Sequence, residues 1–327
     1  MTIHVSVVVP TYQRPALLRR CLEALLAQDL HPTQFEVIVV ADGPDVATCI
    51  LVHSIMPSDP EGMPGPALRY LALPERGGPA AARNVGWRAA RGEIVAFTDD
   101  DCIPDSGWLR AGCAAFAAGV AGASGRIVVP LTDVPSDYER NAAALEHALF
   151  ATANCFYRRV VLQQVGGFDE RFRAAWREDS DLFFALLQQH QRLVRVPDAV
   201  VTHPVRPAAW GVSIGQQRKS MYNALLYKKY PALYHEHLAP IRPYLYYPIV
   251  ITLILSGVGL VRGNGRATQI AFSAWLLLSS VFCLQRLKQT SRSPNHVAEM
   301  IVTSAVIPPL AIFWRLRGAL KFRVIFV

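Results

Sequence analysis

The chain has 327 residues, of which 52% are hydrophobic, and a formal net charge of +8 at pH 7. This length predicts one large domain followed by a second region. No basic stripe is interleaved with aromatic residues, so the excess charge does not indicate nucleic-acid binding and we expect no nucleic-acid partner. The 6 cysteines form no C-x-x-C pair, which argues against a zinc site or a disulfide framework and favours a reducing compartment.

The N-terminal part alternates predicted strands with predicted helices. Continuous apolar runs at residues 4–10, 35–40, 68–73 and 93–98 predict strands that are buried on both faces, as in a parallel sheet. A helix with one apolar face begins at Pro15, and an Ala-rich helix follows Gly77-Gly78-Pro79 and ends at Gly92. This alternation predicts an α/β fold with right-handed crossovers and a mostly parallel sheet.

The pattern becomes less regular after residue 101. Helices are predicted at residues 108–118 and 178–190, and strands at residues 126–129, 152–158 and 193–196. Ser136 and Glu139 have the spacing of a capping box, which predicts a helix that continues to about Leu149. Residues 210–230 have the pattern of a long amphipathic helix that either packs on the domain or lies at a membrane interface.

Three apolar runs dominate the C-terminal part, at residues 244–261, 267–284 and 297–314. The first two are close to the ~20 residues that span a bilayer, whereas the third contains Glu299 and Pro308-Pro309. Basic residues and aromatic residues flank these runs, as suits an anionic membrane surface. We therefore expect a catalytic domain at residues 1–238, including an amphipathic helix at about 208–230. A membrane region is expected at residues 239–327, with two or three transmembrane or interfacial helices.

The apolar run at residues 5–9 is too short for a signal peptide and ends in Pro10. We therefore expect the protein at the cell inner membrane, with its catalytic domain facing the cytoplasm. Because every loop between the C-terminal apolar runs is basic, the distribution of positive charge does not predict the membrane topology.

Acidic residues follow two of the predicted strands. Asp42 follows the strand at residues 35–40, and Asp99, Asp100 and Asp101 follow the strand at residues 93–98. In an open α/β sheet, ligands bind at the carboxyl ends of the strands. Three adjacent carboxylates repel one another unless a cation neutralises them, and carboxylate oxygens suit Mg²⁺ or Mn²⁺. The pattern predicts a divalent metal that holds a substrate diphosphate, and the alternative is a solvated acidic turn.

Several ordered segments between residues 5 and 203 resemble a known family. They are VSVVVPTYQR at 5–14, EVIVVADG at 36–43, GPAAARNVG at 78–86, GEIVAFTDDD at 92–101, GGFDE at 166–170 and EDSDL at 178–182. Together they resemble the inverting family-2 glycosyltransferases of the membrane-associated bacterial type. The resemblance implies a GT-A fold with flanking helices, and the transfer of a sugar from a nucleotide-sugar donor.

The resemblance also implies roles for individual residues. Contacts to the nucleotide-sugar are expected from Pro10, Thr11, Arg14, Asp42, Arg83, Asp99 and Asp100. Asp99 and Asp101 form the D-x-D pair that would hold Mg²⁺ or Mn²⁺, with Asp101 the more direct ligand and His203 a third candidate. Asp179 matches the general base of the family, and Glu178 and Asn154 are expected on the acceptor side.

Structural roles are the alternatives for some of these residues. Arg83 then pairs with a structural carboxylate, Asp42 caps a turn, and Glu178 and Asp179 simply favour a helix N-terminus. A lone histidine such as His203 is more often structural than a metal ligand.

The chain also departs from the family pattern at two places. Ala41-Asp42 stands where the family usually has two aspartates, so one nucleotide contact is missing or comes from elsewhere. No tryptophan follows Gln216-Gln217-Arg218-Lys219, which is the counterpart of the family's Q-x-x-R-W segment. Processive polymerisation is therefore not predicted, nor is the way in which the acceptor is held.

The implied reaction is an inverting transfer in which Asp179 deprotonates an acceptor hydroxyl. The expected partners are a nucleotide-sugar donor, a glycan or lipid-linked acceptor and membrane lipids, in the synthesis of envelope polysaccharide or glycolipid. The alternatives are transfer to polyprenyl phosphate, a catalytically silent nucleotide-sugar-binding subunit, and a metal-dependent nucleotidyltransferase or phosphohydrolase. The donor base, the sugar, the acceptor and the oligomeric state are not predicted.

Overall fold

The computed structural model describes residues 3–55, 66–238 and 244–326. The chain divides into two compact units, and each is described by itself. The first unit comprises Met1–Pro130 and Ala143–Val205, and the second comprises Leu131–Ala142 and Arg206–Val327. The second unit therefore begins at Arg206, earlier than the boundary expected at residue 238, and it includes a short segment that interrupts the first unit.

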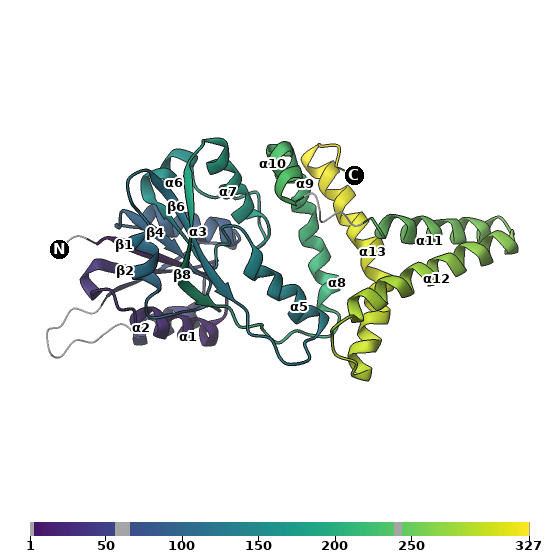
Figure 1. Ribbon diagram of the computed structural model, residues 1–327, viewed down its shortest axis with the longest axis horizontal. Coiled ribbons are helices and arrows are strands. Elements are labelled where there is room, and N and C mark those ends of the chain that lie inside the picture. Colours follow the sequence, from purple (N-terminus) through teal and green to yellow (C-terminus); the bar gives the residue numbers. More distant parts are fainter. Residues whose placement is uncertain (1–2, 56–65, 239–243, 327) are drawn as a thin grey trace. The chain divides into compact units, whose positions relative to one another are not determined.

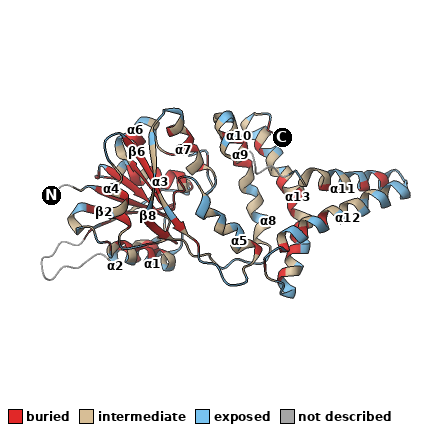
Figure 2. Ribbon diagram, in the orientation of Figure 1, coloured by how far each residue is buried: buried red, intermediate tan, exposed pale blue. Residues whose placement is uncertain are grey.

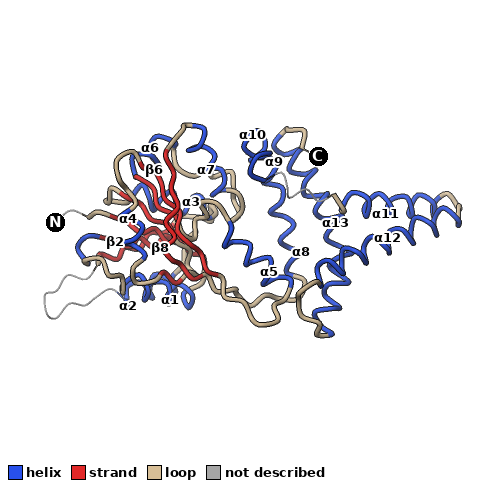
Figure 3. Tube along the Cα trace, in the orientation of Figure 1, coloured by secondary structure: helices blue, strands red, loops and turns tan. Residues whose placement is uncertain are grey.

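The first unit is built on an eight-stranded mixed sheet (Figures 1 and 3). In spatial order the strands are β3 (Ala67–Ala72), β2 (Phe35–Ala41), β1 (Val5–Thr11), β4 (Ile94–Phe97), β7 (Cys155–Arg158), β6 (Val120–Val128), β8 (Arg192–Thr202) and β5 (Ile103–Pro104). The strands β3, β2, β1 and β4 are parallel, whereas β7 runs antiparallel to β4 and to β6. The α/β fold class is thus confirmed, and the antiparallel β7 makes the sheet mixed.

Two strands extend beyond their predicted bounds. The structure has β6 at Val120–Val128, where residues 126–129 are predicted, and β8 at Arg192–Thr202, where residues 193–196 are predicted. These strands pair in parallel with register shifts next to Gly122 and Gly125. Glycines interrupt the apolar pattern of β6, and Pro197-Asp198 interrupts that of β8, yet the backbone ladder continues past them.

The helices of the first unit include four that are predicted and two that are not. The predicted helices are α1 (Pro15–Leu26), α3 (Pro79–Ala89), α4 (Trp108–Ala114) and α7 (Glu178–Gln188). The additional helices are α2 (Val46–Ile55) and α6 (Arg159–Val165), and two 3₁₀ turns are η1 (Pro32–Gln34) and η2 (Ala144–His147). The helix α4 ends at Ala114, before the predicted residue 118.

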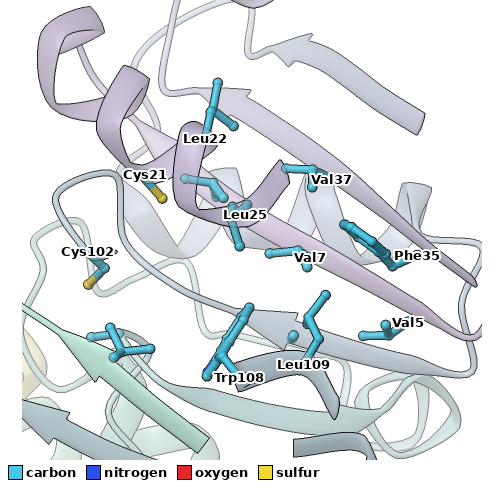
Figure 4. Close-up of a cluster of buried hydrophobic side chains, with 14 of the residues drawn as sticks. Val5, Val7, Cys21, Leu22, Leu25, Phe35, Val37, Cys102, Trp108 and Leu109 are labelled. Carbon is cyan, nitrogen blue, oxygen red and sulfur yellow. The ribbon is translucent and has the colours of Figure 1, made fainter. Parts of the chain in front are cut away.

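The main core of the first unit packs α1 against the sheet (Figure 4). Leu22 and Leu25 of α1 are fully buried with Val7 of β1, and Trp108 of α4 joins the same cluster. Buried residues are concentrated along the strands (Figure 2). Burial of each such apolar side chain stabilises the fold by roughly 1.5–3 kcal/mol. This packing fixes the strand ends that carry the acidic residues.

The second unit consists of helices and loops in its described part (Figure 3). The helices are α5 (Asp137–Ala143), α8 (Val212–Gln216), α9 (Tyr222–Lys229), α10 (Pro231–Leu238), α11 (Tyr246–Val261), α12 (Gly265–Leu287) and α13 (Pro294–Phe322), with the 3₁₀ turn η3 (Gln217–Met221) between α8 and α9. The capping box before α5 is confirmed, because Ser136 N donates to Glu139 Oε2 (2.7 Å) and Glu139 N donates to Ser136 Oγ (3.2 Å).

The helix predicted at residues 210–230 is interrupted in the structure, where α8, the 3₁₀ turn η3 and α9 follow one another without a gap. Two side chains compete for backbone carbonyls at the break: Gln217 donates to Ser213 O (2.9 Å) and Ser220 donates to Gln217 O (2.7 Å). Such local hydrogen bonds offer the backbone an alternative to the regular helix.

The C-terminal apolar runs form three helices. The helices α11 and α12 make a hairpin (Figure 1). The centres of the Tyr246 and Phe282 rings, one from each helix, lie 5.2 Å apart. By length and composition, α12 and α13 are long and apolar enough to cross a membrane, whereas α11 has 16 residues. The helix α13 continues through Pro308-Pro309 and is longer than the predicted run at residues 297–314.

Candidate active site

The carboxyl ends of β1, β2 and β4 meet at one edge of the sheet. Thr11 ends β1, Asp42 follows β2, and the acidic turn Asp99–Asp101 follows β4. Because these strands are parallel neighbours, the sheet brings together polar side chains that are far apart in the sequence. This is the edge at which an open α/β sheet binds its ligands.

Asp100 is tied to the end of β1. Thr11 Oγ1 donates to Asp100 Oδ2 (2.7 Å), and Arg14 Nη1 lies 3.3 Å from Asp100 Oδ1. Burial raises the pKa of Asp100 to about 6, against the opposing effects of the Thr11 hydrogen bond and the Arg14 charge. Thr11, Arg14 and Asp100 thus form one contiguous group next to Pro10, which is buried within β1.

Arg83 of α3 bridges the acidic turn and α7. Its Nη2 donates to Asp99 Oδ1 (2.7 Å), and its Nη1 donates to Glu178 Oε1 (2.9 Å). The side chains of Arg83 and Glu178 are only 3% and 4% exposed. Burial raises the pKa of Glu178 to about 7, although the Arg83 charge opposes this rise. Burial disfavours the Arg83 cation, but the two carboxylates hold its pKa above the ordinary value.

Asp101 lies beside a histidine from the far end of the sheet. His203 follows β8, which pairs with β5 just after the acidic turn, and its Nε2 is 3.5 Å from Asp101 Oδ1. Asp101, Cys102 and His203 each offer a ligand atom, and these atoms lie within 4.8 Å of one another. A carboxylate and an imidazole suit a divalent ion such as Mn²⁺. The residues therefore fit a divalent metal at Asp101, whereas the nearby Asp99 is engaged by Arg83.

Asp179 is the second residue of α7. The preceding Arg177 has a φ of 76°, in the left-handed region, and turns the chain sharply into the helix. Asp179 Oδ1 accepts hydrogen bonds from Ser180 N (2.6 Å) and Ser180 Oγ (3.2 Å), and the side chain is half-buried. Its neighbour Glu178 is held by Arg83, so the first turn of α7 is anchored to the acidic turn.

Asp42 supports the turn before α3. Its Oδ1 accepts hydrogen bonds from Gly77 N and Gly78 N (2.8 Å each), and Arg76 Nε lies 3.7 Å from its Oδ2. Gly78 has a φ of +95°, and a Cβ there would lie 2.7 Å from Arg173 O. The turn therefore requires glycine, and Asp42 Oδ1 caps this turn.

Asn154 lies in the core of the first unit, in contrast to the acceptor-side position expected from the sequence. It is fully buried, its Nδ2 donates to Arg126 O and Ala199 O (2.9 Å each), and its Oδ1 accepts from Trp108 Nε1 (2.8 Å). The Asn154 side chain thus joins β6, β8 and α4 by hydrogen bonds, next to the register shift between β6 and β8 at Gly125. This correction removes Asn154 from the proposed acceptor contacts.

Two features of this edge are not predicted from the sequence. The Arg76 guanidinium lies 4.2 Å from the centre of the Tyr12 ring, beside the group around Asp100. Cys102 joins the possible metal ligands, and its place directly after the acidic turn is the signal that points to it. The Arg76 contact carries no such signal, because the two residues lie on different loops.

Two family profiles match this chain. The profile described as "Glycosyl transferase family 2" matches residues 6–181, and that of "Glycosyl transferase family group 2" matches residues 94–287. The chain belongs to glycosyl transferase family 2. It is therefore a glycosyltransferase, and the resemblance of its five N-terminal segments and of EDSDL to that family is confirmed.

Curated relatives of this glycosyltransferase agree with that assignment. Glycosyltransferase AglE of Haloferax volcanii is 26% identical over 218 residues, which cover 62% of this chain and 67% of the relative. The pre-mycofactocin glycosyltransferase of Mycobacterium tuberculosis is 30% identical over 220 residues, which cover 62% of this chain and 43% of the relative. The chain thus spans less than half the length of the mycobacterial relative.

A solved structure shows the same fold. The mannosyltransferase PcManGT from Pyrobaculum calidifontis, in complex with GDP-Man and Mn²⁺, matches with a TM-score of 0.59 and 20% identity. The match covers 98% of this chain and 88% of PcManGT. The GT-A fold expected from the family resemblance is therefore confirmed.

Proposed function

We propose that the chain is an inverting glycosyltransferase that moves a hexosyl group from a nucleotide-sugar to a hydroxyl of a glycan or lipid-linked acceptor. The observation that carries this proposal is the Arg83 bridge. It joins Asp99, in the acidic turn that faces the donor, to Glu178, next to Asp179 at the start of α7. A donor site and a base are thus held together by one buried cation.

The donor is proposed to bind where β1, β2 and β4 end. The residues that would surround it are Pro10, Thr11, Arg14, Asp42, Arg83, Asp99 and Asp100. Asp101 and His203, with Asp99 nearby, would hold Mg²⁺ or Mn²⁺, and the ion supplies positive charge that stabilises a leaving diphosphate. The complex of PcManGT with GDP-Man and Mn²⁺ supports a nucleotide-sugar and a divalent ion in this fold.

Asp179 is proposed to accept the proton of the acceptor hydroxyl as that oxygen attacks the anomeric carbon. Attack from the side opposite the diphosphate inverts the configuration of the sugar. Glu178 does not itself touch the reacting atoms in this proposal. Its ion pair with Arg83 holds the first turn of α7, and positioning of this kind contributes much of the rate in a displacement reaction.

The acceptor is proposed to lie at the cell inner membrane, with the first unit facing the cytoplasm. The apolar helices of the second unit support membrane association. Such a location suits the synthesis of envelope polysaccharide or glycolipid, and polyprenyl phosphate is the alternative acceptor. Transfer assays that compare polyprenyl phosphate with saccharide acceptors distinguish the two.

The test is the release of nucleoside diphosphate by the detergent-solubilised protein across a panel of nucleotide-sugars, with Mg²⁺ or Mn²⁺ and a membrane extract as acceptor. We expect metal-dependent release from one donor, and its loss in Asp179→Asn. The control is Asp198→Asn, which changes an exposed carboxylate on β8 and should retain full release.

Each other outcome contradicts part of the proposal. Release by Asp179→Asn at the wild-type rate removes Asp179 as the base. Release that persists with a chelator removes the metal role of Asp101. The absence of release from every donor, with nucleotide-sugar binding retained, indicates a silent binding subunit.

A further inference from the structure

The helical hairpin of the second unit is apolar on its outside. Ile254, Leu260, Ile270 and Leu277 are 58%, 72%, 73% and 65% exposed. The turn of the hairpin is polar and exposed, and it consists of Arg262-Gly263-Asn264-Gly265-Arg266. Helices that expose apolar side chains on this scale belong in a bilayer.

The helix α13 differs from the hairpin, because it has two unlike faces. One face is buried by other parts of the second unit and carries Met300, Ser304, Ile307, Ala311 and Gly318. The other face is exposed and apolar and carries Val302, Phe313, Leu316 and Leu320. Residues two apart on a helix are about 200° apart around its axis, so these stripes lie on opposite sides. Only one side of α13 is available to lipid.

The buried face of α13 has charged and polar neighbours near both of its ends. Arg286 donates to Thr303 Oγ1 (2.6 Å) and to Asp137 Oδ2 (2.7 Å). Glu299 Oε1 accepts a hydrogen bond from Gly211 N (2.7 Å). Near the other end, Lys228 Nζ donates to Phe322 O (2.8 Å).

These neighbours argue against α13 as a membrane span. If α13 crossed the bilayer, the segments η3 and α9 that pack along its C-terminal half would be carried toward the hydrocarbon with their charges, among them Arg218 beside Trp314 and Lys228 at Phe322 O. A charged side chain at the bilayer centre costs about 2.5–3.5 kcal/mol by insertion scales. If α13 lies flat, the charged groups remain on the water side, and the stripe from Val302 to Leu320 enters the acyl boundary.

We propose that the α11–α12 hairpin alone crosses the bilayer, and that α13 lies along the membrane surface on the same side as the first unit. The partner is an anionic phospholipid bilayer, because the exposed Arg317 and Lys321 lie beside the apolar stripe of α13. This inference rests on the membrane location in the proposed function, and it is independent of the transfer chemistry.

The length of the hairpin agrees with a crossing. The 16 residues of α11 span ~24 Å at 1.5 Å per residue, a few ångströms less than a hydrocarbon core of ~30 Å. Arg262 and Arg266 in the turn have long side chains that reach beyond the helix ends to the far headgroups. The polar turn therefore ends among headgroups instead of in hydrocarbon.

The test uses one exposed cysteine at a time, in a chain that keeps its four buried thiols, and a membrane-impermeant maleimide on sealed vesicles of both orientations. The full chain carries Cys49→Ser and Cys113→Ser, which removes the half-buried thiols, and then one of three exposed replacements. Gly265→Cys reports the hairpin turn, Lys321→Cys reports the end of α13, and Val46→Cys on α2 marks the side of the first unit. A Cβ at Gly265 meets no atom within 4 Å, so this replacement should be tolerated.

We expect the label at Gly265→Cys from one side only, and the labels at Lys321→Cys and Val46→Cys from the other side only. Labelling of Lys321→Cys from the same side as Gly265→Cys shows a third span and overturns the proposal. Labelling of all three from one side, in protein that resists a carbonate wash, shows a hairpin that does not cross. If the wash removes the protein, the membrane location itself fails, and the proposed transfer is still tested by diphosphate release.

Discussion

Replacement of Arg83 by methionine tests the buried bridge directly. The change removes the cation between Asp99 and Glu178 and keeps a side chain of similar length. Breaking a buried ion pair typically costs about 3–5 kcal/mol, because a charge remains without its partner. Asp99 is 29% exposed and contributes little to this cost, so most of it comes from Glu178. We expect the low end of that range, about 3 kcal/mol.

The cost should depend on pH in a defined direction. Burial raises the pKa of Glu178 to about 7, and Arg83 acts to lower it, so the pKa of Glu178 rises further in Arg83→Met. A carboxyl group whose pKa is raised in the folded state loses stability as the pH rises from its unfolded pKa to its folded pKa. That loss ends near pH 7 in the wild type and continues to higher pH in the variant. The stability deficit should therefore grow above pH 7, by at most ~1.4 kcal/mol per pH unit.

The assay is the urea midpoint of the first unit, measured by pulse proteolysis of the detergent-solubilised chain at pH 6 and pH 8. The matched control is Arg88→Met on the same helix, whose partner Glu170 is 3.7 Å away and whose side chain is 53% exposed. An exposed pair of this kind contributes about 0–1 kcal/mol. An Arg83→Met deficit no larger than that of the control, or one that shrinks from pH 6 to pH 8, would refute the reasoning.

Three further predictions concern the turn before α3 and the reaction itself. Gly78→Ala should destabilise the first unit by about 1–3 kcal/mol, because its φ is +95° and a Cβ would lie 2.7 Å from Arg173 O. The control is Gly107→Ala in the same unit, where φ is −86° and a Cβ would meet only the side-chain ends of Arg110 and Asp29, so the urea midpoint should stay close to that of the wild type. Asp179→Asn should abolish transfer and leave the donor Kd unchanged by calorimetry, and a weakened Kd would indicate a donor contact instead. Asp101→Ala should weaken donor binding with Mn²⁺ more than without it, and equal weakening would count against a metal ligand.

The parallel half of the sheet is predictable because its strands are continuous apolar runs that end at polar residues. The runs before Thr11, Asp42 and Asp99 are each followed by a polar side chain at the carboxyl end of a strand. Where glycines and polar residues interrupt the strands, as at Gly122 and Gly125, the hydrogen-bonded ladder continues but the pattern does not, so β6 and β8 are predicted too short.

The sequence indicates which residues gather at the candidate site, but it does not predict the hydrogen bonds and ion pairs between them. The acidic turn, Asp179 and His203 follow from motifs, whereas the partners of Arg83 depend on the packing of α3 against α7. The prediction for Asn154 fails for the same reason. No local pattern indicates that its side chain bonds to Trp108 Nε1, Arg126 O and Ala199 O. Local sequence patterns do not predict hydrogen bonds between buried polar groups that are far apart in the sequence.

The segment Leu131–Ala142 has a consequence for any attempt to obtain the catalytic unit alone. The chain leaves the first unit before this segment, returns after it, and leaves again after Val205, so the two units share three covalent connections. A stop codon after Val205 would remove Arg286 and leave the Asp137 carboxylate, only 11% exposed in the whole chain, without its cation. A soluble fragment would therefore require an internal replacement of this segment as well as the C-terminal truncation.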